Sequence, residues 1–146
     1  MRCEKFRVNG EVLRVNCEGI TDHKTIINMD HKKLDAWKYS MDLVERIYKI
    51  TSSFPKSEVY GLTSQIRRSA VSVPSNIAEG AARDSNKEYH RFLNISLGSL
   101  SELETQLMIA VRLNYINDSD NILVDLINLR KIIIGLKKYI KKSINP

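Results

Sequence analysis

Residues 119–143 read SDNILVDLINLRKIIIGLKKYIKKS, and the fold can be worked out from this stretch. Its apolar residues recur at spacings that alternate between four and three residues, which is the period of one face of an α-helix. This first stripe consists of Ile122, Leu126, Leu129, Ile133, Leu136 and Ile140. A second stripe beside it consists of Leu123, Ile127, Ile134 and Ile144. Because a helix that is apolar on two sides needs two partners, the pattern favours self-association over a wide core stripe within one monomer.

Two helical patterns lie further towards the N-terminus. One runs from Asp35, which can cap it, to about Thr51 and carries two apolar stripes. These stripes are Trp37, Met41, Val44 and Tyr48, and beside them Leu43, Ile47, Ile50 and Phe54. The next covers roughly 56–82, with Pro55 suited to its first position. Pro74 interrupts this second pattern, but the apolar phase continues across it, which predicts one kinked helix rather than two.

The remaining pattern begins at the capping-box sequence Ser85-Asn-Lys-Glu88 and runs from Asn86 to about Asn114. Its seam consists of Phe92, Ser96, Leu100, Leu103, Leu107 and Ala110. Small residues at 98, 99 and 101 would let a neighbour pack closely there. Four amphipathic helices with short connections predict an all-α, up-down-up-down four-helix bundle.

The first 33 residues look different from the rest. Alternating apolar residues flank Asn9-Gly10, which is typical of a β-hairpin, whereas residues 16–33 show no clear period. We therefore expect residues 1–33 to be a poorly ordered or hairpin-like extension and residues 34–146 to be the bundle domain. A further hypothesis places the native start at Met29, so that residues 1–28 are a translated leader.

Composition excludes several classes of protein. Of the 146 residues 42% are hydrophobic and 27% charged, an ordinary globular balance. Two cysteines are too few for a disulfide scaffold, no apolar run reaches the ~20 residues of a membrane helix, and no signal peptide is visible. These features predict a cytoplasmic protein.

The net charge of +6 is unevenly placed. Residues 1–30 hold five basic and five acidic residues, so the whole excess lies in the helical part. The last helix contributes Arg130, Lys131, Lys137, Lys138, Lys141 and Lys142 with no acid between them. Such an excess supports polyanion binding, although a solvated helix face is an equal alternative.

Catalytic and metal-binding patterns are weak. His23, His31 and His90 lack metal-ligand spacing, and neither a phosphate-binding glycine loop nor a nucleophile elbow occurs. We therefore expect no metal, no cofactor and no enzymatic activity. One short pattern, Arg83 followed by His90, resembles the R-x4-6-H signature of the metal-independent ribonucleases of the HEPN superfamily, in which the histidine transfers protons and the arginine holds phosphate.

Residues 62–83 read LTSQIRRSAVSVPSNIAEGAAR, with Asp35-Ala-Trp37 ahead and LGSLSELET at 97–105 behind. This pattern resembles the bacterial four-helix bundle protein family, also named for an open reading frame in intervening sequences of 23S ribosomal RNA genes. The resemblance covers about residues 31–142. The matching positions are Gln65, Arg67, Arg68, Ser72, Asn76, Glu79, Gly80, Arg83, Gly98, Ser99, Glu102 and Glu104.

The resemblance implies a ring-like homopentamer, similar to the accessory variability protein of diversity-generating retroelements, a basic pentamer that binds a reverse transcriptase and nucleic acid. Five copies would carry about +30 on one particle. We expect a non-enzymatic, oligomeric scaffold whose basic side chains contact RNA or DNA phosphates. The candidate contact residues are Arg67, Arg68, Arg83, Arg130, Lys131, Lys137, Lys138, Lys141 and Lys142. The alternatives are a protein-interaction adaptor, for example for a reverse transcriptase, and the ribonuclease.

Overall fold

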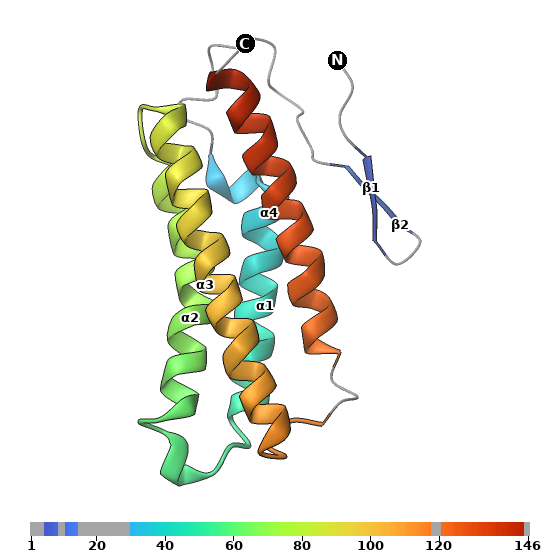
Figure 1. Cartoon of the computed structure of the whole chain (residues 1–146), viewed down its shortest axis with the longest axis vertical. Coiled ribbons are helices and arrows are strands. Elements are labelled where there is room, and N and C mark those ends of the chain that lie inside the picture. Colours follow the sequence, from blue (N-terminus) through green and yellow to red (C-terminus); the bar gives the residue numbers. More distant parts are fainter. Residues whose placement is uncertain (1–4, 9–10, 15–29, 118–120, 145–146) are drawn as a thin grey trace.

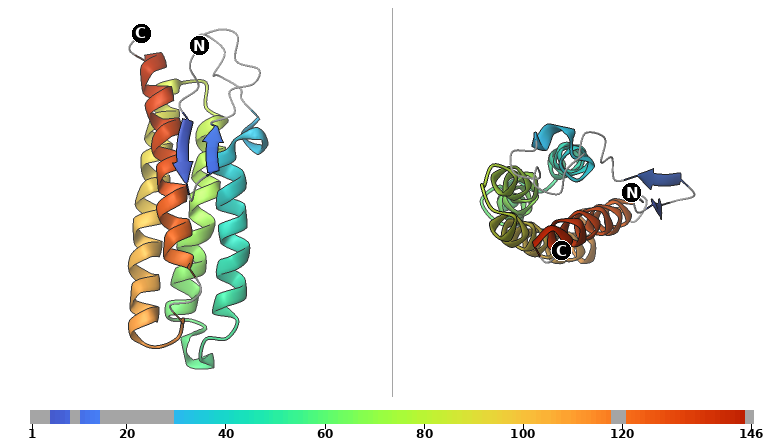
Figure 2. Two further views of the ribbon diagram at one scale, coloured as in Figure 1. Left: turned by 90° about the vertical axis from the view of Figure 1, so that its right-hand side faces the viewer. Right: turned by 90° about the horizontal axis from the view of Figure 1, so that it is seen from above.

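Four antiparallel helices form the body of the protein, for which a computed structural model describes residues 5–8, 11–14, 30–117 and 121–144. They are α1 (Asp35–Thr51), α2 (Leu62–Ala81), α3 (Asn86–Arg112) and α4 (Ile122–Ile144). Each packs on its neighbours in order, and α1 also contacts α4, so the bundle closes (Figures 1 and 2). The predicted all-α, up-down-up-down architecture is confirmed.

The N-terminal segment contains the hairpin that Asn9-Gly10 indicated. Strand β1 (Lys5–Val8) pairs antiparallel with β2 (Glu11–Arg14) in the register Lys5↔Arg14 to Val8↔Glu11. Of the extension expected over residues 1–33, residues 1–4, 9–10 and 15–29 lie outside the described residues, and so does the alternative start at Met29. A short 3₁₀ helix, His31–Lys33, leads into α1 and is capped by the Asp30 side chain.

The core lies along the seams read from the sequence. All six residues of the first stripe of α4 are buried, as are Leu100, Leu103 and Leu107 of α3. The two stripes predicted around α1 differ, because Leu43, Ile47 and, just after the helix, Phe54 are buried whereas Met41 and Tyr48 are exposed. None of the helices in the described ranges is long and apolar enough to cross a membrane.

Helix boundaries correct three details of the sequence prediction. Asp35 is the first residue of α1 and not its cap, since Leu34 takes the cap position without a side-chain bond. Pro55 precedes a 3₁₀ turn, Lys56–Glu58, and α2 starts only at Leu62, where the Glu58 carboxylate accepts the backbone N–H at 3.0 Å. The last helix starts at Ile122 rather than near residue 119.

Helix α2 continues through Pro74, so one helix rather than two is confirmed. Proline removes a backbone donor, and nearby side chains bond carbonyls in the same turn. Ser75 Oγ donates to the Val71 carbonyl at 2.8 Å, and Asn76 Nδ2 donates to the Ser72 carbonyl at 2.8 Å. At the start of α3, the Ser85 hydroxyl accepts the Glu88 N–H, the first half of the predicted capping box.

Candidate nucleic-acid interface

The nine candidate contact residues do not form one surface. Lysines 137, 138, 141 and 142 lie on the last turns of α4, at the end of the bundle where α3 begins (Figure 1). Arg130 and Lys131 lie further back on α4. Arg67 and Arg68 lie in the N-terminal half of α2, towards the opposite end. The structure therefore divides the predicted interface into a basic end and a separate arginine pair.

The basic end brings α3 and α4 together around His90. Burial first, and then the charges of Lys137 and Lys141, lower the pKa of the His90 imidazole. Its Nε2 is buried with no hydrogen-bond partner in the described part of the chain. Burial accounts for the largest part of this shift, and the two lysine charges add to it, which places positive charge near His90 at this end of the bundle.

Arg83 lies near the same end but on a different side of α3. Its guanidinium is bonded to the Glu79 carboxylate one turn earlier and lies over the Phe92 ring, 5.0 Å from the centroid. Residues two apart on a helix point to different sides, so an arginine over Phe92 is not placed beside His90. The geometry gives no support to the Arg83–His90 ribonuclease pair.

Arg130 joins two helices. Its Nη2 lies 2.6 Å from Glu104 Oε2 on α3, and its Nη1 donates to Ser101 Oγ at 3.4 Å. Both charged side chains are about one-third exposed, at 32% and 33%. This predicted contact residue is therefore engaged in an interhelical ion pair, which reduces the charge it offers to a ligand.

Several motif residues hold α2 against α3. The hydroxyls of Ser72 and Ser99 lie 2.8 Å apart across the helix interface, and Asn76 Nδ2 also donates to Ser72 Oγ at 3.0 Å. Within α3, Gln106 Nε2 donates to Glu102 Oε1 at 3.0 Å, and Gln106 Oε1 accepts a bond from Ser69 Oγ of α2 at 2.7 Å. These contacts give the motif a packing function within the bundle.

The two motif glycines have opposite surroundings. A Cβ on Gly80 would lie 2.6 Å from Tyr89 Cδ2 and 2.7 Å from Phe92 Cβ, so only glycine lets α3 approach α2 there. A Cβ on Gly98 would have no neighbour within 4 Å. The small residues of α3 predicted that a neighbouring element packs closely on them. At Gly98 no described part of the chain does so.

The arginine pair borders a surface hollow of about 480 Å³ near the start of α2. Arg67 Nε donates to Thr51 Oγ1 at 2.8 Å, and its guanidinium lies 4.6 Å from the centroid of the Tyr48 ring. Arg68 Nη2 donates to Gln65 Oε1 at 2.9 Å. The Thr51 and Tyr48 contacts orient the Arg67 guanidinium, whereas Arg68 bonds Gln65 on the exposed surface of α2.

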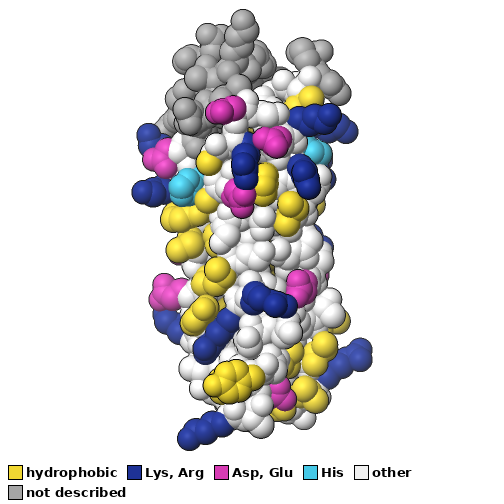
Figure 3. Space-filling view, turned by 90° about the vertical axis from the view of Figure 1, so that its left-hand side faces the viewer, with side chains coloured by type: hydrophobic (Ala, Val, Ile, Leu, Met, Phe, Trp, Pro, Cys, Tyr) yellow, Lys and Arg dark blue, Asp and Glu magenta, His cyan; other side chains and the backbone are white. Residues whose placement is uncertain are grey.

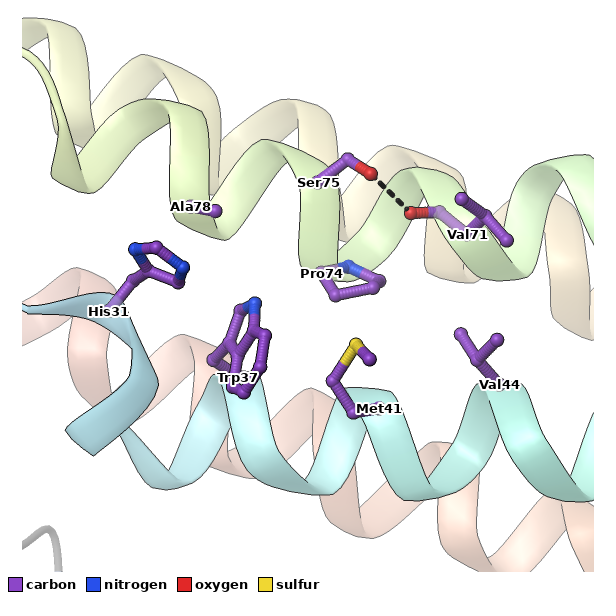
Figure 4. Close-up of a pocket in the computed structure, with 8 residues that line it drawn as sticks. All are labelled: His31, Trp37, Met41, Val44, Val71, Pro74, Ser75 and Ala78. Atoms are coloured by element: carbon purple, nitrogen blue, oxygen red, sulfur yellow. Dashed lines mark hydrogen bonds between the residues drawn. The ribbon is translucent and has the colours of Figure 1, made fainter.

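A second hollow, of about 350 Å³, follows the groove between α1 and α2 (Figure 4). Trp37, Met41 and Val44 from α1 face Pro74 and Ala78 from α2 across it. His31 closes one end, with its ring 5.3 Å from the Trp37 ring in an edge contact. Hydrophobic side chains follow a line down one edge of the face shown in Figure 3, and basic and acidic side chains are spread along the whole length of that face.

Sequence reasoning missed the hollow beside the arginine pair. The apolar spacing places Tyr48 in a packing stripe, and it predicts no role for Tyr60, Thr63 or Ser64. The sequence does contain one signal for this hollow. Tyr60 lies just before Gly61, after the turn that Pro55 begins, and it belongs to none of the apolar stripes. In the part of the chain that the structure describes, no three histidine, cysteine, aspartate or glutamate side chains gather to hold a metal ion.

Two comparisons with known proteins, with family models and with solved structures, find matches. A family model described as 23S rRNA-intervening sequence protein matches residues 32–135. Among solved structures, the chain is similar to a protein of unknown function from the S23 ribosomal protein family of Bacteroides thetaiotaomicron VPI-5482. The two share 25% sequence identity with a TM-score of 0.66, over 70% of this chain and 98% of the other. No curated protein matches the chain.

Proposed function

The chain belongs to the 23S rRNA-intervening sequence protein family, and we propose that it is a non-enzymatic, oligomeric scaffold that binds nucleic acid through basic surfaces. The family predicted from residues 62–83 is thereby confirmed. The similarity to the accessory variability protein of diversity-generating retroelements is part of the proposal. So are the pentamer and the binding of RNA or DNA.

The observation that carries the proposal is the basic end of the bundle. Four lysines lie on the last turns of α4, and two of them, Lys137 and Lys141, are close enough to His90 of α3 to add to the effect of burial in lowering its pKa. From residue 126 to residue 146 the chain contains no acidic residue. Nucleic-acid phosphates are the polyanions that such a surface binds without base readout.

Binding to a labelled RNA or DNA at several salt concentrations tests this function. The logarithm of the binding constant should fall linearly with the logarithm of the salt concentration, because bound cations release counterions from the nucleic acid. Replacing Lys137 and Lys141 with glutamine should weaken binding and reduce the slope by about two.

The matched control is Lys49→Gln, because Lys49 lies in α1 and is already paired with Glu45 at 2.7 Å. This variant loses one positive charge away from the basic end, as each of Lys137→Gln and Lys141→Gln alone does at that end, so its slope should stay close to that of the wild type. The purified oligomer failing to bind at low salt would exclude the proposed function. A loss as large for Lys49→Gln as for the lysine pair would exclude the basic end as the contact surface.

The proposed oligomer is supported by two apolar surfaces on different sides of the bundle. One is the α1/α2 groove of Figure 4, where Met41 is 43% exposed. The other is the exposed side of α4, formed by Val124, Ile127 and Ile134. A ring requires each subunit to present two different surfaces that fit one another, which this pair would provide.

A further inference from the structure

The hollow at the start of α2 combines two features that suit an unpaired nucleotide. It is lined by two tyrosines, two arginines, two hydroxyl residues and two valines. None of the eight described residues that line it is acidic. At about 480 Å³ it lies within the range of roughly 300–1,000 Å³ typical of small-molecule sites. Its charge therefore favours an anionic occupant over a cationic or neutral one.

The tyrosines give the hollow an aromatic surface that phosphate binding alone does not need. Tyr60 is 97% exposed, so its ring packs on almost nothing in the bundle. Tyr48 is 45% exposed and carries the Arg67 guanidinium over its ring. Nucleobases stack on tyrosine rings and on arginine planes, but only where the base is not already stacked inside a duplex.

Beside the two tyrosine rings, the hollow contains guanidinium and hydroxyl groups. Arg67 is held by Thr51 and Tyr48, so its guanidinium is oriented before any ligand arrives, and the exposed Arg68 lies one residue further along α2 and bonds Gln65. Thr63 lines the hollow, and its Oγ1 is buried with no hydrogen-bond partner in the described part of the chain. Ser64 adds a second hydroxyl.

We propose that this hollow binds an unpaired nucleotide of a single-stranded nucleic acid, with the base on Tyr60 and the phosphate on Arg67 and Arg68. The inference rests on the proposed function and narrows it from any polyanion to a single strand. The basic end would then attract the nucleic acid, while the hollow would distinguish single strands from duplexes.

Fluorescence anisotropy with a labelled, unstructured 12-nucleotide RNA, and with the same strand annealed to its complement, tests the proposal. We expect the wild-type protein to prefer the single strand. Tyr60→Ala should weaken single-strand binding about fivefold or more, because one stacked base is lost. The same variant should leave duplex binding unchanged.

Tyr60→Phe is the matched control, because it keeps the ring and should keep single-strand affinity. Since Tyr60 is almost fully exposed, neither variant should disturb folding, which circular dichroism verifies. An unchanged single-strand affinity in Tyr60→Ala, or an equal loss for single strand and duplex, would overturn the proposal. Displacement of the RNA by polyglutamate of equal charge would overturn it too, because charge alone would then explain binding.

The outcomes separate this proposal from the function on which it rests. Wild-type protein that binds neither RNA form would remove both. Protein that binds both forms in a salt-dependent way, with no effect of Tyr60→Ala, would leave the nucleic-acid function standing and exclude only the stacking hollow.

Discussion

His90 is the residue at which the basic end can be examined by titration. Its pKa lies below the usual value of about 6.5 because the ring is partly buried and Lys137 and Lys141 are near. Between that lowered value and about 6.5, the unfolded chain binds the proton more readily than the folded chain does. The free energy of unfolding should therefore fall as pH drops below about 6.5 and level off above it.

His90→Gln should flatten this part of the pH profile, which urea unfolding measured from pH 5 to pH 8 would reveal. His31→Gln is the control, since that ring packs on Trp37, whereas Lys137 and Lys141 of α4 act on His90. A profile for His90→Gln as steep as that of the wild type would contradict the assigned environment.

Tyr89 is a buried tyrosine whose hydroxyl has no hydrogen-bond partner in the described ranges. Burial raises the pKa of this hydroxyl well above its usual range, so it stays protonated. A buried, unsatisfied polar group costs about 1–3 kcal/mol. Tyr89→Phe removes the hydroxyl and keeps the ring, so it should raise the free energy of unfolding by about 1 kcal/mol. Chemical denaturation measures this gain, and a loss of stability would show that the hydroxyl has a partner.

At the scale of single residues, the sequence does not show which partner each basic side chain contacts. The sequence alone shows where the basic residues are. It correctly indicates that the last helix carries a long series of them with no acidic residue in between. It could not show that Arg130 reaches Glu104 on α3, because a pairing 26 positions apart depends on how two helices pack. It also could not show that Arg83 lies over Phe92 rather than beside His90.

At the scale of elements, the packing of α2 on α3 can be tested with its two motif glycines. Alanine is the better helix former by about 1 kcal/mol, so Gly98→Ala, where the added Cβ meets open space, should raise stability by up to that amount. Gly80→Ala should lower stability by about 1–3 kcal/mol, because the added Cβ would press on Tyr89 and on Phe92 Cβ. Urea unfolding of the two variants side by side measures both effects. Equal effects at the two positions would contradict the described packing.

The elements were predictable where burial follows a helical period. The α4 seam and the continuity of α2 across Pro74 came directly from spacing. The start of α2 did not, because the side chain of Glu58 caps Leu62 after a 3₁₀ turn that periodicity cannot distinguish from helix. The two stripes of α1 read as equally apolar, and only the positions of α2 and α4 decide which is buried.

The whole molecule presents the apolar α1/α2 groove and the apolar side of α4 on different sides, and its oligomer can be tested through them. Met41→Glu places a charge in the groove, and Ile127→Glu places one on α4. Both residues are more than 40% exposed in the single chain, so the fold of each variant should survive. Because a ring needs both surfaces on every subunit, each variant alone should lose the oligomer in light-scattering mass measurements.

Mixing the two variants distinguishes the ring from other assemblies. The Met41→Glu subunit keeps its α4 surface, and the Ile127→Glu subunit keeps its groove, so the mixture can form one intact contact per pair. The mass should rise from one chain to two and stop there, because the two remaining surfaces are both altered. A two-fold contact that pairs the same surface on both subunits would give no such recovery, since every mixed contact would contain one altered copy. Recovery to a dimer therefore supports a head-to-tail ring, and a wild-type mass for both single variants would exclude these surfaces from the assembly.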